Sequence, residues 1–203
     1  MTTTVLLVRH GQTDSNITGF YMGRSNEDLN DVGYTQARRL SSRLASLPIA
    51  SVYTSPLRRA YATAMIVAKP HKLEPVVLDS LVEIELGDWQ GLHMEEIKQR
   101  WPEIWQHWRN DPSQISLPNG ESLADVTERA IQAFREIVRA NQAEYSVIVA
   151  HEAIVKVLVA HTLGVSNSIY RQFEIGNASL SVIQVTNNGP RLARLNDTSH
   201  LET

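Results

Sequence analysis

The sequence has no cysteine, and this absence excludes several kinds of chemistry. Among its 203 residues there is no thiol to form a disulfide, to attack a substrate as a thiolate, or to ligate a zinc ribbon or an iron–sulfur cluster. Long apolar runs are also missing. The first residues, MTTTVLLV, lack the basic start and the apolar length of a signal peptide. We therefore expect a cytoplasmic protein that does not associate with a membrane.

An excess of charge of one sign is missing as well. The 19 Lys and Arg face 22 Asp and Glu, which gives a formal net charge of −3, and no block of like charge interrupts the chain. Nucleic acid is therefore not an expected partner. The composition, 42% hydrophobic and 20% charged, is that of a globular protein. We predict a single domain over residues 1–203.

Short runs rich in valine and isoleucine alternate with longer amphipathic stretches. The predicted strands are Thr4 to Val8, Ser51 to Thr54, Pro75 to Leu78, Ser146 to Ala150, Ser179 to Val185 and a weaker Arg191 to Leu195. The predicted helices include 37–47, 57–69, 153–163 and a stretch that begins near 123, where Ser122 and Asp125 have capping-box spacing. This alternation predicts a mostly parallel six-stranded sheet covered by helices on both faces, closed by an antiparallel hairpin.

Two stretches interrupt the alternation. Residues 11–31 make a long connection between a strand and a helix, and residues 83–121 hold three tryptophans at helical spacing among prolines. For Trp101, Trp105 and Trp108 a packed helix face is favoured over a direct substrate role. Both stretches follow parallel strands, so we expect them to overhang the sheet edge where α/β proteins bind ligands.

Basic and acidic side chains gather where predicted strands end. Arg9 and His10 follow the first strand, and His151 follows a later one. Arg59 lies just after another strand, and Glu83 follows a fourth. Each residue taken alone has an ordinary structural explanation, but together they indicate an anionic substrate that is both held and attacked. A zinc site is the competing use of the two histidines.

The sequence around His151 argues against zinc. A zinc-protease helix needs a second histidine four residues after the first, and this chain has Val155 there.

The order and spacing of these residues resemble the histidine phosphatase superfamily, in its phosphoglycerate mutase-like branch. The similarity begins with the run Arg9, His10, Gly11, Gln12, Thr13 and Asn16, and it continues along nearly the whole chain through Gly23, Gly33, Ser55, Arg59, Ala60, Glu83, Trp89, Gly120, Glu121, Ser122, His151 and Asn177. The resemblance implies a three-layer α/β/α sandwich, a phosphohistidine intermediate and no metal or other cofactor. It also suggests a homodimer and an inserted cap segment at about 83–121.

The resemblance implies a role for each matching residue. His10 matches the nucleophile, Glu83 the proton donor, His151 the second histidine, and Arg9 and Arg59 the phosphate-binding arginines. Further substrate contacts are expected from Asn16, Gly23, Glu152 and His200, as well as from Arg9, Arg59 and His151.

Residue 152 is where the chain departs from the family pattern. The family commonly has glycine after the second histidine, whereas this chain has Glu152. We expect the Glu152 side chain to point away from the site, at the N-terminus of a helix where negative charge is favoured.

The chemistry of these residues suggests a phosphatase. A neutral imidazole can attack a phosphomonoester dianion, two arginines can stabilise the developing charge, and Glu83 can protonate the leaving group. We expect Glu83 to ionise among the arginines until the bound dianion raises its pKa, and His151 to be protonated when substrate is bound. A small phosphorylated metabolite is the expected partner.

Two alternatives remain from the sequence. One is a cofactor-dependent phosphoglycerate mutase, which is disfavoured because Ile84 follows Glu83 where such mutases carry arginine. The other is a catalytically weak binding protein, which the complete set of candidate residues argues against.

Overall fold

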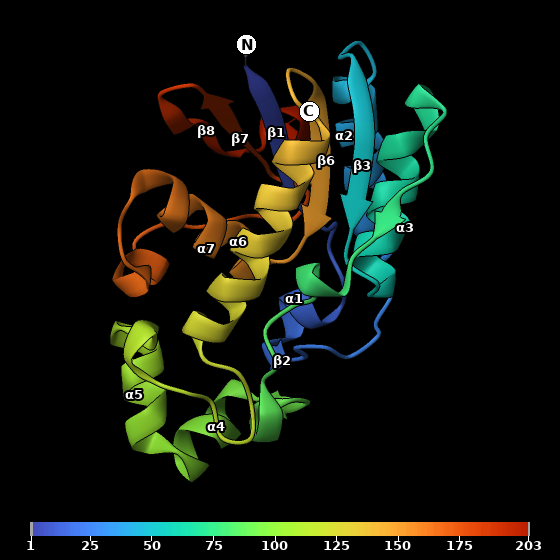
Figure 1. Ribbon diagram of the computed structural model, residues 1–203. Helices are drawn as coiled ribbons and strands as arrows, with labels where there is room; N and C mark the ends of the chain where they lie inside the picture. The colour runs from blue at the N-terminus through green and yellow to red at the C-terminus, as the bar shows by residue number, and fades with distance from the viewer. Residues whose placement is uncertain (1, 203) are drawn as a thin grey trace.

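The computed structural model describes residues 2–202, and a six-stranded sheet forms its centre (Figure 1). The strands lie in the order β4-β3-β6-β1-β7-β8. Their bounds are β1 Thr3–Arg9, β3 Ile49–Thr54, β4 Val76–Val77, β6 Tyr145–Ala150, β7 Leu180–Thr186 and β8 Gly189–Asp197. The first four in this order are parallel, and β7 and β8 run antiparallel to their neighbours. The predicted mostly parallel sheet with an antiparallel edge is confirmed.

The side chains of β1 point alternately to the two faces of the sheet, and this explains why helices cover both faces. Val5 and Leu7 face a core built with α6 (Leu123–Ala140) and α7 (Glu152–Leu163). Leu6 and Val8 face the opposite core, built with α2 (Asp31–Leu44) and α3 (Arg58–Ala68). Successive side chains of a strand point to opposite faces, so an unbroken apolar strand requires helices on both sides. Figure 1 shows α2 beside α3 and α6 beside α7.

Side chains cap the helices that start near the carboxyl ends of the parallel strands. The predicted capping box of α6 is present, with Ser122 and Asp125 bonded to each other's backbone N–H groups. Asn30 caps α2 by accepting from Gly33 N–H. A Cβ atom on Gly33 would lie 2.1 Å from the Gln12 carbonyl oxygen, so only glycine lets α2 start this close to the chain that follows β1.

The two stretches that interrupt the alternation lie together, beyond the arrowheads of β3 and β6 in Figure 1. The first contains α1 (Ser15–Thr18) and β2 (Phe20–Tyr21), and the second contains β5 (Leu92–His93), α4 (Met94–Arg100) and α5 (Pro102–Asn110). β2 and β5 pair antiparallel and join the two stretches. Both therefore overhang the carboxyl ends of the parallel strands, as predicted.

The tryptophans of the second stretch make a packed cluster. Trp89 is fully buried, and its ring centroid lies 6.0 Å from that of Trp105 and 5.8 Å from that of Trp108. This agrees with the predicted packing role of the helix face.

Short 3₁₀ turns complete the chain at Lys69–His71, Asp79–Leu81, Gly87–Trp89, Pro112–Gln114, Asn167–Arg171 and Ser199–Leu201. Over the described part of the chain, no helix combines the length and apolarity needed to cross a bilayer.

Candidate active site

His10 lies directly after β1, where the backbone fixes its position. Its N–H donates to the Ala150 carbonyl at 3.0 Å, and its own carbonyl accepts from Ala178 N–H at 3.0 Å. The ring Nδ1 lies 2.7 Å from the Gly11 carbonyl, an acceptor, so Nδ1 carries the hydrogen and Nε2 keeps its lone pair. Burial, with Arg59 and Arg9 nearby, lowers the pKa of His10 well below its usual value. His10 is therefore a neutral imidazole whose unprotonated Nε2 accepts a hydrogen bond from Arg59 Nε.

Arg59 is in the first turn of α3, and its guanidinium is held in a fixed orientation beside His10. Nε is 3.2 Å from His10 Nε2, and the two terminal nitrogens donate to the carbonyls of Ser25 (2.6 Å) and Gly23 (2.7 Å). The residue is only 4% exposed. Arg58, its neighbour, is exposed and does not line the cavity described below. The structure thus places Arg59, and not Arg58, at the cavity.

His151 follows β6 and lies behind His10. The two ring centroids are 5.1 Å apart, and His151 Nε2 lies 2.7 Å from Ser55 Oγ. Its Nδ1 is buried and has no hydrogen-bond partner among residues 2–202. Burial, with Arg59 and His10 next in effect, lowers its pKa well below the usual value. Without a bound anion the ring is therefore neutral, and the tautomer that accepts from Ser55 keeps an unused Nδ1–H donor.

Glu83 lies across the cavity on the chain that follows β4. Its Oε1 accepts from Ile84 N–H at 2.8 Å. Burial raises the pKa of Glu83, outweighing the opposing effects of the Ile84 N–H and of Arg59. Desolvation therefore shifts this carboxyl toward its protonated form even without a ligand, in addition to the shift expected from a bound dianion.

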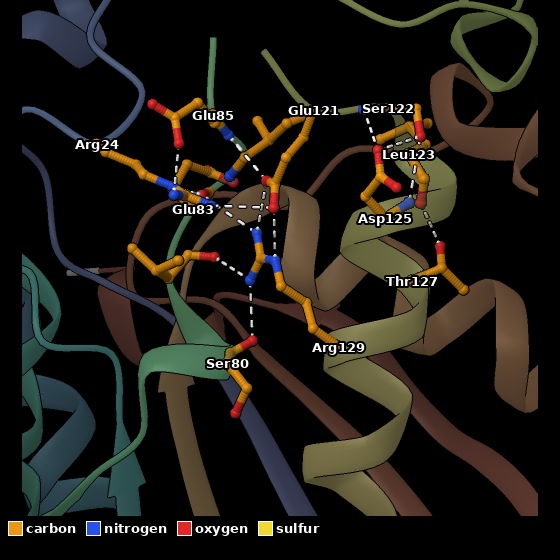
Figure 2. A network of polar contacts seen from close by, with 12 residues as sticks. Arg24, Ser80, Glu83, Glu85, Glu121, Ser122, Leu123, Asp125, Thr127 and Arg129 are labelled. Atoms are coloured by element: carbon orange, nitrogen blue, oxygen red, sulfur yellow. Dashed lines mark hydrogen bonds and ion pairs between the residues drawn. The ribbon is translucent and has the colours of Figure 1, made fainter. Parts of the chain in front are cut away.

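A network of arginines and carboxylates holds the backbone of Glu83 (Figure 2). The Glu83 carbonyl accepts from Arg24 Nε at 3.1 Å and from Arg129 Nη2 at 3.3 Å. Glu121 makes ion pairs with both arginines at 3.0 Å and also accepts from Glu85 N–H. Arg129 donates further to the carbonyls of Ser80 and Val82. We call Arg24, Glu121 and Arg129 the Glu83 clamp.

Sequence reasoning did not assign the clamp. The run Gly120, Glu121, Ser122 carried the family resemblance without a role, and nothing linked it to Arg129. The signal that could have been used is spacing, because Glu121 immediately precedes the cap of α6 and Arg129 lies two turns into that helix.

A cavity of about 360 Å³ brings most of the predicted residues together. Its polar wall contains Arg9, His10, Asn16, Gly23, Arg59, Glu83 and Glu152. Asn16 Oδ1 accepts from Thr13 N–H and from Asn177 Nδ2, so its own amide N–H₂ is the group left to donate. The outer wall contains Phe20, Tyr21 and Met22 from the first of the two stretches predicted to overhang this edge and Met94 and Trp108 from the second. It also contains Tyr170 and Arg171, which the sequence did not predict.

Glu152 does not point away from the site as expected. Its Oε2 lies 3.2 Å from Arg9 Nη1, its Oε1 lies 2.8 Å from Lys156 Nζ, and the residue lines the cavity. Burial alone would raise its pKa, but Arg9 and Lys156 lower it. Two cations therefore hold the carboxylate inward, an effect stronger than the helix N-terminus on which the prediction relied.

His200 lies outside the cavity lining, which corrects its predicted place on the wall. Nε2 contacts the Ala178 carbonyl at 3.0 Å, and Nδ1 lies 3.1 Å from Arg43. Because Ala178 N–H donates to the His10 carbonyl, His200 supports the segment behind the nucleophile.

The arrangement can hold and attack a tetrahedral dianion. A neutral imidazole nitrogen, two arginines, an asparagine and a carboxyl whose pKa is raised by burial surround one space. Within residues 2–202, no three His, Asp or Glu side chains are grouped to hold a metal ion.

Comparison with known proteins agrees with this geometry. The model of the histidine phosphatase superfamily (branch 1) matches residues 5–198. The chain is 33% identical over 197 residues to phosphoserine phosphatase 1 of Hydrogenobacter thermophilus, covering 97% of this chain and 93% of that protein. The chain belongs to the histidine phosphatase superfamily and is classed with phosphomonoester hydrolases.

Solved structures show the same fold. Bacillus stearothermophilus YhfR superposes with a TM-score of 0.93 at 33% identity, over 98% of this chain and 100% of that chain. The mycobacterial glucosyl-3-phosphoglycerate phosphatase Rv2419c superposes with a TM-score of 0.89 at 28% identity, over 97% of this chain and 99% of that chain. The predicted phosphoglycerate mutase-like fold is confirmed.

Proposed function

We propose that this protein is a metal-independent phosphatase that hydrolyses small phosphorylated metabolites through a phosphohistidine on His10. The observation that carries the proposal is the state of the His10 ring. Nδ1 donates to Gly11, the pKa is low, and Nε2 faces a buried guanidinium. Such a nitrogen is unprotonated and positioned where the charge of a phosphoryl group would be neutralised.

In the first step His10 Nε2 attacks phosphorus and the ester oxygen departs. Arg9 and Arg59 stabilise the charge on the phosphoryl oxygens, and Asn16 donates its amide N–H. His151 supplies the free Nδ1–H while Ser55 holds its Nε2. Glu83, whose pKa is raised by burial, transfers a proton to the leaving oxygen.

In the second step water replaces His10 on phosphorus. The Glu83 carboxylate produced by the first step now accepts a proton from the attacking water, so one residue serves as acid and then as base. The products are phosphate and the alcohol, and the enzyme returns to its starting protonation state. The pair of arginines supplies the positive charge that a metal ion would otherwise provide.

We further infer that residues 83–121 act as a cap over the cavity. Leu86, Met94 and Trp108 from this segment contribute to the outer wall. A wall of this kind restricts access to small substrates, which supports a metabolite rather than a phosphoprotein as the substrate.

The test is to trap the intermediate. Purified protein treated exhaustively with EDTA should still hydrolyse p-nitrophenyl phosphate, and a base quench during turnover of a ³²P-labelled ester should yield an acid-labile phosphoenzyme. His10→Ala should remove the label and lower turnover by about 10⁶-fold. Activity that requires added magnesium or zinc, or an acid-stable label, would contradict the proposal. Conversion of 3-phosphoglycerate to 2-phosphoglycerate with 2,3-bisphosphoglycerate present would indicate the mutase alternative.

A further inference from the structure

Arg171 lies on the outer wall of the same cavity, and packing holds its guanidinium in place. Nε donates to the Trp108 carbonyl at 3.0 Å. The guanidinium carbon lies 4.8 Å from the centroid of the Trp108 ring and 5.5 Å from that of Tyr170. Stacked arginines of this kind lose little further freedom on binding, because the planar group is already oriented. Arg171 is thus a pre-oriented cation in a cavity wall.

Arg171 makes no ion pair within the described part of the protein. No carboxylate of residues 2–202 lies within ion-pair distance of it, whereas Arg9, Arg24 and Arg129 each have such a partner. Its Nη2 is buried and makes no hydrogen bond within the described chain. Leaving a buried charged donor unpaired is costly, and such groups in binding sites are normally satisfied by a ligand.

Glu152, the carboxylate on the same side of the cavity, is already paired. It bridges Arg9 and Lys156, and so it is not available to Arg171. The phosphoryl group also has its own partners, because Arg9 and Arg59 adjoin His10. A substrate anion at Arg171 is therefore a second anion, carried by the leaving group.

We propose that Arg171 binds a carboxylate on the leaving group, so that the preferred substrates are phosphate esters of small hydroxycarboxylic acids. The inference rests on the phosphatase function proposed above. One guanidinium matches one carboxylate in charge and in its planar fork, whereas a second phosphate dianion would require further cations. The rest of the outer wall is largely aromatic and apolar, and the cavity of about 360 Å³ suits a molecule of a few carbons.

The test uses two matched pairs of esters that differ in the carboxylate. 3-Phosphoglycerate and glycerol 3-phosphate share a skeleton in which CH₂OH replaces the carboxylate, and phosphoserine and phosphoethanolamine differ by its presence. The wild-type enzyme should show a higher kcat/KM for the acid of each pair. Arg171→Met, which keeps an apolar stem against Trp108, should reduce each ratio by about 10- to 100-fold. Arg171→Lys should retain part of the preference.

Arg109→Met is the matched control. Arg109 also stacks on a tryptophan, with its guanidinium carbon 5.9 Å from the Trp105 centroid, but it does not line the cavity. For Arg109→Met, the kcat/KM ratio within each pair of esters should equal that of the wild-type enzyme. Equal wild-type kcat/KM within each pair, or a proportional loss on all four esters in Arg171→Lys, would overturn the role of Arg171 while leaving the phosphatase intact. If Arg171→Met does not fold, the kcat/KM ratios of the wild-type enzyme and of Arg171→Lys still test whether Arg171 recognises the carboxylate. Absence of wild-type turnover on any ester would instead reject the proposed function.

Discussion

The two ends of the cavity are built in different ways. At the inner end, Arg9, His10 and Arg59 are fixed by hydrogen bonds to the backbone carbonyls of Ile175, Gly11, Ser25 and Gly23. At the outer end, Phe20, Trp108 and Tyr170 come from segments beyond the sheet, and their rings pack on other rings, Trp108 on Tyr170 and Phe20 on His93. Backbone hydrogen bonds tolerate little displacement, whereas aromatic packing accepts many shapes. The fold thus fixes the reacting atoms and leaves the choice of leaving group to the inserted segments.

The largest loss of activity should come from substituting Arg59 at the inner end of the cavity. Arg59→Ala removes a buried cation and leaves the Gly23 and Ser25 carbonyls without their donor. We expect kcat/KM for p-nitrophenyl phosphate to fall by about 10³- to 10⁵-fold, as for other arginines that stabilise a phosphoryl transition state. Arg58→Ala, next to it but exposed, should stay within threefold of wild type, about the effect expected at the surface. Similar losses in the two variants would contradict the separation seen in the structure.

The next largest effect lies where the two ends meet, at Glu83. Glu83→Gln keeps the shape and removes the acid, so kcat/KM for an alkyl phosphate should fall by about 10²- to 10⁴-fold. The loss should be smaller for p-nitrophenyl phosphate, because nitrophenolate leaves without a proton. The ratio of the two losses, measured on the same enzyme preparation, is the readout. Equal losses would mean that Glu83 positions the phosphate instead of protonating the leaving group.

A smaller effect should follow from loosening the Glu83 clamp. Arg129→Met removes the donors to Val82 and Glu83, and we expect about a 10- to 100-fold loss in kcat/KM for alkyl phosphates, as is usual for residues that orient a catalytic group. KM for p-nitrophenyl phosphate should change little. Lys98→Met, which removes the surface ion pair with Glu95, is the control. If Arg129→Met lowers activity on both substrates equally, its role is structural stability and not the orientation of Glu83.

The smallest effect concerns stability and follows from the buried imidazoles of the inner end. His10 and His151 have low pKa values when folded, so below about pH 6.5 the unfolded chain binds protons that these groups do not. The free energy of unfolding should therefore fall as the pH drops below about 6.5, because protons then bind the unfolded chain in preference to the folded one. Urea unfolding at several pH values measures this slope. His10→Gln combined with His151→Gln should flatten it.

The inner end could be predicted from sequence because its residues adjoin strands. Arg9 and His10 follow an apolar run directly, and parallel strands bring such positions to one edge. The orientation of the Glu152 side chain was predicted wrongly because it depends on Arg9, which is distant in sequence. Arg171 was missed because an arginine in a short 3₁₀ turn has no local pattern, and only its stacking on Trp108 reveals it. Local periodicity predicts elements well and contacts between distant side chains poorly.

We expect the backbone hydrogen bonds of His10 to form late during folding. Residues 9 and 10 are tied to Ala150 on one side and to Ile175 and Ala178 on the other, across more than 130 intervening residues. Contacts between such distant parts of a chain form slowly, because a long loop must close before they give any stability. A collapsed chain can hold its helices and still leave the nucleophile unoriented. Recovery of turnover after dilution from urea should therefore lag behind recovery of helical circular dichroism, so that enzymatic activity reports the last step of refolding.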